Sequence, residues 1–228
     1  MQASNILKQL GCFGIIPVVV IDTQADAGLL ADALMEGGLP AMEITFRTDA
    51  ARAVIMQIAR THPSILLGAG TVLTVDQAKT AIDCGANFIV SPGLNPAVVE
   101  YCLRNEVTII PGVITPTEIT TALSAGVEVV KFFPAEASGG VEYLKAVSAP
   151  FRTVKYIPTG GINESNVVSY LRIPSVIACG GSWMVKNELI RGKRFDEIKR
   201  LTSDAVRLVS GMGRDRSPYS QPPARTNL

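Results

Sequence analysis

The sequence predicts an α/β fold: a single-domain (β/α)8 TIM barrel with a short N-terminal helix. Short β-branched or aromatic runs alternate with amphipathic segments along most of the chain. Eight such pairs follow one another with short connections, as in a compact barrel of parallel strands. The 228 residues, of which 47% are hydrophobic and 18% charged, suffice for one large core. A doubly wound open sheet is the alternative, but it needs a different strand count and usually a phosphate loop near the first strand.

The elements follow in order after an amphipathic start over Ser4–Leu10. Each expected strand is a short apolar run bounded by glycine, proline or a capping residue. The strands are expected at Ile15–Ile21, Ala41–Phe46, Ile65–Ala69, Phe88–Ser91, Thr108–Val113, Val129–Phe133, Thr153–Ile157 and Ser175–Ala178. The helices are expected at Gln24–Glu36, Asp49–Arg60, Val75–Cys84, Pro96–Arg104, Pro116–Ala125, Gly140–Val147, Asn163–Tyr170 and from Trp183 onward. The barrel therefore spans residues 1–211, and the polar, proline-bearing segment 212–228 is expected to be a disordered tail.

Composition excludes several function classes. The net charge of +1 gives no broad electrostatic reason to bind nucleic acid or a membrane surface. No apolar run reaches the roughly 20 residues of a membrane-spanning helix, and Leu10–Ile21 contains Pro17 and reads as a strand rather than a signal peptide. The four cysteines form no CxxC pair and His62 is the only histidine, so no metal site is expected and a reducing cytoplasm fits.

Lys131 stands in the middle of the apolar strand VEVVKFFPAE. Val129, Lys131 and Phe133 share one face of that strand because side chains alternate. Burial in an apolar site lowers the pKa of a lysine and leaves a neutral, nucleophilic fraction. Lys131 is therefore a candidate for Schiff-base formation. The alternative is a strand-end lysine whose ammonium reaches water or a carboxylate.

The second strand carries polar residues on one face. Glu43, Thr45 and Arg47 alternate in AMEITFRT and would point together into the barrel mouth, where active sites of such barrels lie. Glu43 is a candidate for proton transfer, and Arg47 could bind a carboxylate or phosphate. A structural ion pair between Glu43 and Arg47 is the alternative.

Paired glycines end the seventh and eighth strands. PTGGIN and CGGSWM each place two glycines beside a hydroxyl residue, just before an expected helix. Amides at a helix amino terminus favour anions, and barrels often bind phosphate with the loops after strands seven and eight. These two segments are expected to form a phosphate or carboxylate site, although such a pair can also be a tight turn. GAGT ends the third strand, where its two glycines allow a ligand or another backbone to approach and Thr71 offers a hydroxyl. SPGLNP and PGV end the fourth and fifth strands and are interpreted as turns that shape the rim.

MEITFRT, GAGTVL, SPGLNP, PGVITPTE, VVKFFPAEASGG, PTGGIN and GGSWMV together resemble the 2-keto-3-deoxy-6-phosphogluconate (KDPG) and 4-hydroxy-2-oxoglutarate (KHG) aldolase family, in order from about residue 14 to 210. The resemblance implies a metal-independent class I aldolase without a cofactor, usually trimeric, that cleaves KDPG to pyruvate and glyceraldehyde 3-phosphate, with KHG as a further substrate. It implies Lys131 as the Schiff-base lysine and Glu43 as the general acid and base. The substrate contacts it implies are Arg47, Thr71, Pro92, Phe133, Thr159, Gly160, Gly161, Gly180, Gly181 and Ser182. Phe46 stands where leucine is common in the family, but its side chain is expected to face away from the site.

Other functions remain open at the sequence level. The same iminium chemistry would serve an aldolase for the galactonate epimer or an oxaloacetate decarboxylase. A non-catalytic phosphosugar-binding barrel would need no reactive amine. An isomerase or epimerase on a phosphate-binding barrel would not need an imine-forming lysine.

Overall fold

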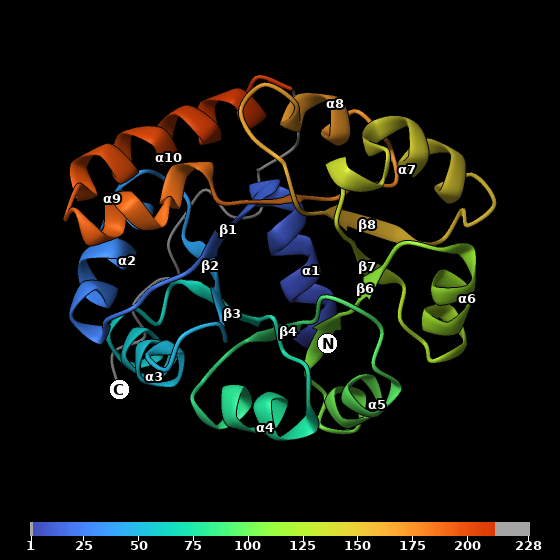
Figure 1. Cartoon of the computed structure of the whole chain (residues 1–228), viewed down its shortest axis with the longest axis horizontal. Helices are drawn as coiled ribbons and strands as arrows, with labels where there is room; N and C mark the ends of the chain where they lie inside the picture. The colour runs from blue at the N-terminus through green and yellow to red at the C-terminus, as the bar shows by residue number, and fades with distance from the viewer. Residues whose placement is uncertain (1, 213–228) are drawn as a thin grey trace.

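The computed structural model describes residues 2–212. Within them the chain forms an α/β fold in which a parallel sheet curls into a half-barrel with helices around its outer side (Figure 1). The expected tail over 212–228 lies, apart from residue 212, outside the described residues.

All strand pairings in the described part of the chain are parallel. One sheet has the order β5-β4-β3-β2-β1-β9 and the other the order β6-β7-β8. The strands are β1 (Ile15–Val19), β2 (Ala41–Thr45), β3 (Leu66–Gly70), β4 (Phe88–Val90), β5 (Thr108–Ile110), β6 (Gly112–Val113), β7 (Val129–Phe132), β8 (Lys155–Pro158) and β9 (Cys179–Gly181). Every expected strand except the last coincides with these within a few residues.

The expected strand Thr108–Val113 is divided at Pro111. Its first part, β5, pairs with β4, whereas its second part, β6, pairs with β7. Proline has no N–H to donate to a ladder, but its carbonyl oxygen accepts a hydrogen bond of 2.9 Å from the Lys131 amide. Pro111 therefore marks the point where one continuous segment passes from one sheet to the other.

The last strand lies later than expected. Ser175–Ala178 is not a strand, although Val176 forms an isolated bridge with Tyr156. The strand is Cys179–Gly181, whose residues pair with Ile15, Ile16 and Pro17 of β1. The glycine pair in CGGSWM predicts a turn because glycine has low strand propensity. Pairing with β1 overrides that local preference here.

Helices follow the strands in turn. They are α1 (Gln2–Phe13), α2 (Ala27–Glu36), α3 (Ala51–Thr61), α4 (Val75–Asp83), α5 (Pro96–Arg104), α6 (Pro116–Ser124), α7 (Gly140–Ser148), α8 (Val167–Leu171), α9 (Asn187–Arg191) and α10 (Phe195–Ser210), with 3-10 turns η1 (Gln24–Asp26), η2 (Glu136–Ser138) and η3 (Trp183–Val185). The expected helix Asn163–Tyr170 starts only at Val167. The Asn163 side chain instead accepts hydrogen bonds from the backbone and hydroxyl of Ser165, a local arrangement that competes with helix formation.

The sheet has two apolar faces. Outward residues such as Val19, Ile44 and Phe132 pack beneath the helices. Inward residues form a second cluster, into which α1 inserts Ile6 and Leu10. The alternation of side chains along each strand separates the two sets. Polar side chains on the inner face are therefore placed above an apolar floor.

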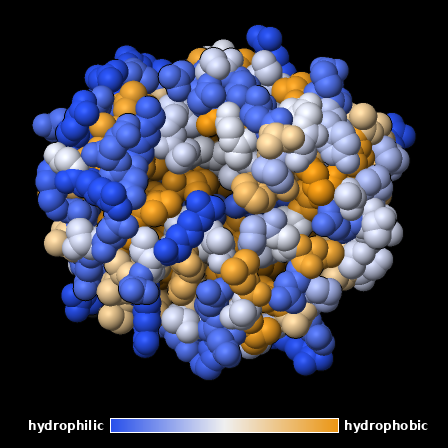
Figure 2. Space-filling view, in the orientation of Figure 1, coloured by the Kyte–Doolittle hydropathy of each residue, from blue (hydrophilic) through white to orange (hydrophobic). Residues whose placement is uncertain are grey.

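The outer surface is mixed in character. Figure 2 shows hydrophilic residues over α2, α9 and α10, and hydrophobic residues gathered in a hollow near the centre of the view. Lys199 of α10 pairs with Glu36 of α2, and Arg191 of α9 pairs with Asp22 in the loop after β1. No helix within residues 2–212 is long and apolar enough to cross a membrane.

Candidate active site

Lys131 points inward from the middle of β7. Its side chain is buried, with a residue exposure of only 5%. The neighbouring register pairs it with Gly112 on one side and Ile157 on the other. Its Nζ lies 5.2 Å from the centroid of the Phe133 ring, so an aromatic face shields the amine. This is the setting the sequence predicted for Lys131.

Glu43 reaches the same place from β2, which is not a neighbour of β7 in either sheet. It is 3% exposed, and its Oε1 lies 3.5 Å from Lys131 Nζ. That contact is an ion pair but too long for a well-formed hydrogen bond, and Oε1 has no hydrogen-bond partner among the described residues. Two buried groups of opposite charge therefore lie close together, and Glu43 Oε1 can still accept a hydrogen bond.

The alternative pairing of Glu43 with Arg47 is wrong for the described structure. β2 ends at Thr45, so Arg47 has left the strand and is exposed. Thr45 has a partner of its own, because its hydroxyl donates a 2.9 Å hydrogen bond to the Val19 carbonyl. Alternation along the strand therefore predicted the direction of Glu43 but not the position of Arg47.

Gly70 makes room for the Glu43 carboxylate. A Cβ at this position would lie 1.8 Å from Glu43 Oε1 and 2.4 Å from its Cδ. Thr71 follows directly and has a φ of 56°, a left-handed conformation that is unusual for a β-branched residue. Local strain of this kind clusters at functional sites. The motif GAGT therefore makes room for the carboxylate. The sequence predicted that its two glycines allow a close approach, but not that the Glu43 side chain is the group that approaches.

Pro92 supports the opposite wall of the site. Its carbonyl oxygen would lie 2.1 Å from a Cβ on Gly112, the residue that pairs with Lys131. Only glycine fits where these two backbones meet. Pro92 therefore lies against β6, the strand that pairs with the Lys131 strand.

The two glycine pairs come together at the ends of β8 and β9. Thr159 forms an isolated bridge with Gly180, and a Cβ there would lie 2.4 Å from the Thr159 hydroxyl oxygen. On the other side, a Cβ on Gly160 would lie 3.4 Å from the Phe133 ring. Gly160 and Gly161 have φ of 101° and 80°, which glycine adopts without strain. The first glycine pair, Gly160 and Gly161, thus lies between the end of the Lys131 strand and the second pair, Gly180 and Gly181.

The expectation that each glycine pair directly precedes a helix is wrong. Gly180 and Gly181 belong to β9, and the 3-10 turn η3 follows Ser182. Gly160 and Gly161 are separated from α8, which starts at Val167. Any anion held here would therefore meet loop and strand-end groups rather than the amino terminus of a full helix.

The side chains of Arg47 and Ser182 are exposed and make no hydrogen bond or ion pair within residues 2–212. They lie just beyond the ends of β2 and β9.

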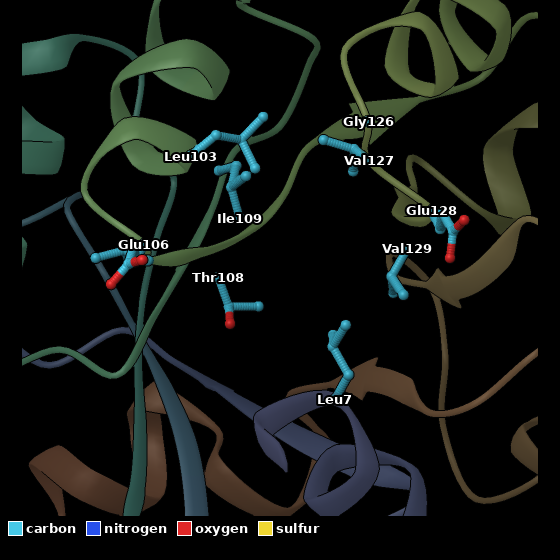
Figure 3. A pocket seen from close by; sticks show the side chains of 10 residues that line it. Leu7, Leu103, Glu106, Thr108, Ile109, Gly126, Val127, Glu128 and Val129 are labelled. Atoms are coloured by element: carbon cyan, nitrogen blue, oxygen red, sulfur yellow. The ribbon is translucent and has the colours of Figure 1, made fainter. Parts of the chain in front are cut away.

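Figure 3 shows a separate cavity of about 390 Å³, which lies at the other end of the sheet because its lining includes the first residues of two strands. Leu7 of α1, Thr108 at the start of β5 and Val129 at the start of β7 line it. Lys131 and Glu43 are not among its lining residues. Across the described residues no group of three His, Cys, Asp or Glu side chains could hold a metal ion.

Comparison with known proteins gives a consistent relationship. The family model described as "KDPG and KHG aldolase" matches residues 5–201. A 2-dehydro-3-deoxy-phosphogluconate aldolase of Treponema pallidum (strain Nichols) is 47% identical over 208 residues, covering 91% of this chain and 99% of the relative. A KHG/KDPG aldolase of Escherichia coli (strain K12) is 38% identical over 192 residues, covering 84% and 90%.

Solved structures agree with the sequence relatives. The KDPG aldolase of Legionella pneumophila, with pyruvate captured as a covalent carbinolamine, matches with a TM-score of 0.85 at 38% identity, covering 88% of this chain and 97% of that one. The KDPG aldolase of Zymomonas mobilis ZM4 with 3-phosphoglycerate matches with a TM-score of 0.84 at 36% identity, covering 90% and 96%. This chain belongs to the KDPG and KHG aldolase family.

Proposed function

We propose that this chain is a class I aldolase that cleaves KDPG to pyruvate and glyceraldehyde 3-phosphate, and KHG to pyruvate and glyoxylate. The observation that carries the proposal is that Lys131 and Glu43 are both buried and lie 3.5 Å apart on the inner face of the sheet. The names of the relatives and the carbinolamine in the Legionella enzyme support the same chemistry.

Lys131 acts as the nucleophile. Its neutral amine attacks the C2 ketone of the substrate and forms a carbinolamine, whose hydroxyl leaves as water to give an iminium. Glu43 donates the proton that this hydroxyl needs. Passing one proton from the Lys131 ammonium to Glu43, whose Oε1 lies 3.5 Å away, gives this neutral amine and the protonated carboxyl that then acts as the donor.

Cleavage follows from the iminium. Glu43 accepts the proton of the C4 hydroxyl, the C3–C4 bond breaks, and its electron pair moves to the nitrogen to form an enamine while the aldehyde leaves. Protonation of the enamine carbon and addition of water then release pyruvate and restore the amine. One carboxylate can serve all these steps, because each step leaves Glu43 in the protonation state that the next step requires.

The remaining residues divide between the two ends of the substrate. Arg47 and Thr71 bind the carboxylate of the pyruvate half, and Pro92 and Phe133 pack against it. Thr159, Gly160, Gly161, Gly180, Gly181 and Ser182 hold the distal phosphate. The bridge between Thr159 and Gly180 supports this grouping, since it brings both glycine pairs to one rim.

The same proposal extends to the architecture and the assembly. Residues 1–211 form one closed (β/α)8 barrel, supported by bridges that link Tyr156 and Thr159 of the β8 region to Val176 and Gly180. The enzyme acts on small molecules as a cytoplasmic homotrimer, without a metal, a cofactor, nucleic acid or a membrane. Sedimentation equilibrium tests the trimer, and a monomer or dimer at micromolar concentration would contradict it.

Borohydride reduction in the presence of pyruvate tests the chemistry. Intact and peptide mass analysis should find a reduced pyruvyl adduct on Lys131, and none in Lys131→Ala. The matched control is Lys155→Ala, because Lys155 lies on the adjacent strand and pairs with Val129 rather than with the site. A folded wild-type protein without an adduct, or a Lys131→Ala variant with near-normal turnover, would overturn the proposal.

A further inference from the structure

Glu136 follows the Lys131 strand and has no part in the proposed chemistry, yet it is held by a buried partner. It opens the 3-10 turn η2, and its Oε1 accepts a hydrogen bond from the hydroxyl of Tyr170 in α8. Tyr170 is fully buried. Burial, together with the adjacent Glu136 carboxylate, raises the pKa of Tyr170, so the tyrosine remains the donor.

The Glu136 side chain lies against the first glycine pair. A Cβ on Gly161 would be 2.6 Å from Glu136 Cγ and 2.7 Å from its Cβ. On its other side, a Cβ on Gly140 would be 3.3 Å from Glu136 Oε1 and 3.4 Å from the Tyr170 hydroxyl. Glu136 is itself exposed, and its side chain lies between Gly161 and the start of α7. The helices α7 and α8 are at the upper right of Figure 1.

The backbone joins the same two loops. The Ala135 amide donates to the Thr159 carbonyl at 2.8 Å, and the Glu136 amide donates to the Gly160 carbonyl at 3.1 Å. Asn166 of the α8 region donates its side-chain amide to the Gly161 carbonyl at 3.0 Å. Hydrogen bonds therefore hold the segment after β7 and the loop after β8 together as one unit. The hydrogen bond between Tyr170 and Glu136 ties this unit to α8.

We propose that Glu136, held by Tyr170, is a positioning residue that fixes the Gly160–Gly161 loop at a set distance from Lys131 and so governs selectivity for phosphorylated aldols. This rests on the proposed function, in which that loop holds the distal phosphate. Two adjacent glycines with positive φ lose much conformational freedom when ordered. A loop ordered in advance spares the substrate that cost, so the effect falls on binding of the phosphate end.

The consequence is a difference between substrates. A compound with a phosphate uses the loop, whereas KHG and pyruvate do not. Weakening the Glu136–Tyr170 hydrogen bond should therefore raise KM for KDPG and leave the phosphate-free reactions unchanged. A purely structural role would affect the substrates equally.

The test uses Tyr170→Phe and Glu136→Gln in the full-length enzyme. Tyr170→Phe should raise KM for KDPG on the order of 10-fold, because a hydrogen bond to a charged group is lost. Glu136→Gln retains an acceptor and should give a smaller increase. The kcat on KDPG, the kcat/KM on KHG and the pyruvate trapping rate should each change less than about twofold.

Two tyrosines serve as matched controls. The Tyr143 hydroxyl donates a 3.0 Å hydrogen bond to the Ile114 carbonyl, and the buried Tyr156 hydroxyl has no partner among the described residues. Tyr143→Phe and Tyr156→Phe should leave the KM ratio between KDPG and KHG unchanged.

Equal changes on both substrates, or none on either, would overturn the inference. A wild-type protein that traps no pyruvate would overturn the proposed function instead. A wild-type enzyme that traps pyruvate and cleaves KDPG, with variants that fail to separate the substrates, would refute only the role of Glu136.

Discussion

Glu43 lies beside Lys131 because Gly70 leaves space for its carboxylate. Neither residue alone defines the site, since they come from strands that are not adjacent in either sheet. Replacing Glu43 by glutamine keeps the volume and removes the ability to exchange protons.

Glu43→Gln should therefore retain the fold and lose on the order of 10²- to 10⁴-fold in kcat for KDPG cleavage. Steady-state kinetics, with circular dichroism as the check of folding, measures this. Arg60→Gln, on the exposed face of α3, is the control and should retain activity. An unchanged rate in Glu43→Gln would reduce the residue to a partner of the Lys131 charge.

Thr71 offers a second test at this scale. Its φ of 56° is a strained conformation that glycine adopts freely. Thr71→Gly should raise the free energy of unfolding by about 1 kcal/mol and lower kcat/KM, because the hydroxyl proposed to bind the substrate carboxylate is lost.

Urea unfolding and kinetics on the same samples separate these effects. Glu106→Gly is the matched control, since Glu106 also has a φ of 56° but follows α5, at the end of the sheet away from Lys131. It should gain stability without losing activity. A Thr71→Gly enzyme with full activity would remove Thr71 from the site.

The start of α6 shows how local sequence fixes an element. Thr115 and Glu118 form a capping box: the Glu118 amide donates to the Thr115 hydroxyl oxygen at 3.3 Å, and Glu118 Oε2 accepts from the Thr115 amide at 2.8 Å. Pro116 occupies the first helical position, where its missing N–H costs nothing.

Thr115→Ala should lower the free energy of unfolding by about 1 kcal/mol. Urea denaturation measures the loss, and Thr120→Ala in the middle of α6 is the control, expected to change stability by less than about 0.5 kcal/mol. Equal effects in both variants would show that the cap adds nothing beyond helix propensity.

The same box predicts a pH dependence. Burial opposes ionisation of Glu118, but hydrogen bonds from the Ile114 and Thr115 amides and the Thr115 hydroxyl outweigh it and lower its pKa. Its contribution is therefore fully present above the unfolded value of about 4.5 and is lost as the pH falls through the lowered folded value. The stability difference between wild type and Glu118→Ala should shrink below pH 4.5, and a difference that grows there would contradict this.

At the scale of the whole molecule, the first and last units meet where α2 packs on α10. A Cβ on Gly37 would lie 2.7 Å from both Thr202 Cβ and Cγ2, and 3.0 Å from the Lys199 carbonyl oxygen. This contact brings residues far apart in the sequence together in the helical layer (Figure 1).

Gly37→Ala should therefore destabilise the protein by about 1 to 3 kcal/mol through overpacking. Gly28→Ala in the same helical region is the control, because its nearest neighbours would be 3.8 Å away. Thermal unfolding compares the two, and a Gly37→Ala variant as stable as Gly28→Ala would show that α10 shifts freely.

The sequence by itself determined the order of strands and helices, the inward direction of Lys131 and Glu43, and the family. These follow from local rules: side chains alternate along a strand, and proline, glycine and capping residues end the elements. Short motifs in a fixed order are also visible without a structure. The helix Pro96–Arg104, which Asn95 caps, begins and ends as predicted for this reason.

The tertiary structure alone decided which segments meet. It moved the last strand onto Cys179–Gly181, because pairing with β1 outweighs the weak strand propensity of glycine. It also placed Gly70 under Glu43 and Glu136 between Tyr170 and Gly161. Such contacts join residues distant in the chain, and their energies depend on packing and register, which no local pattern encodes.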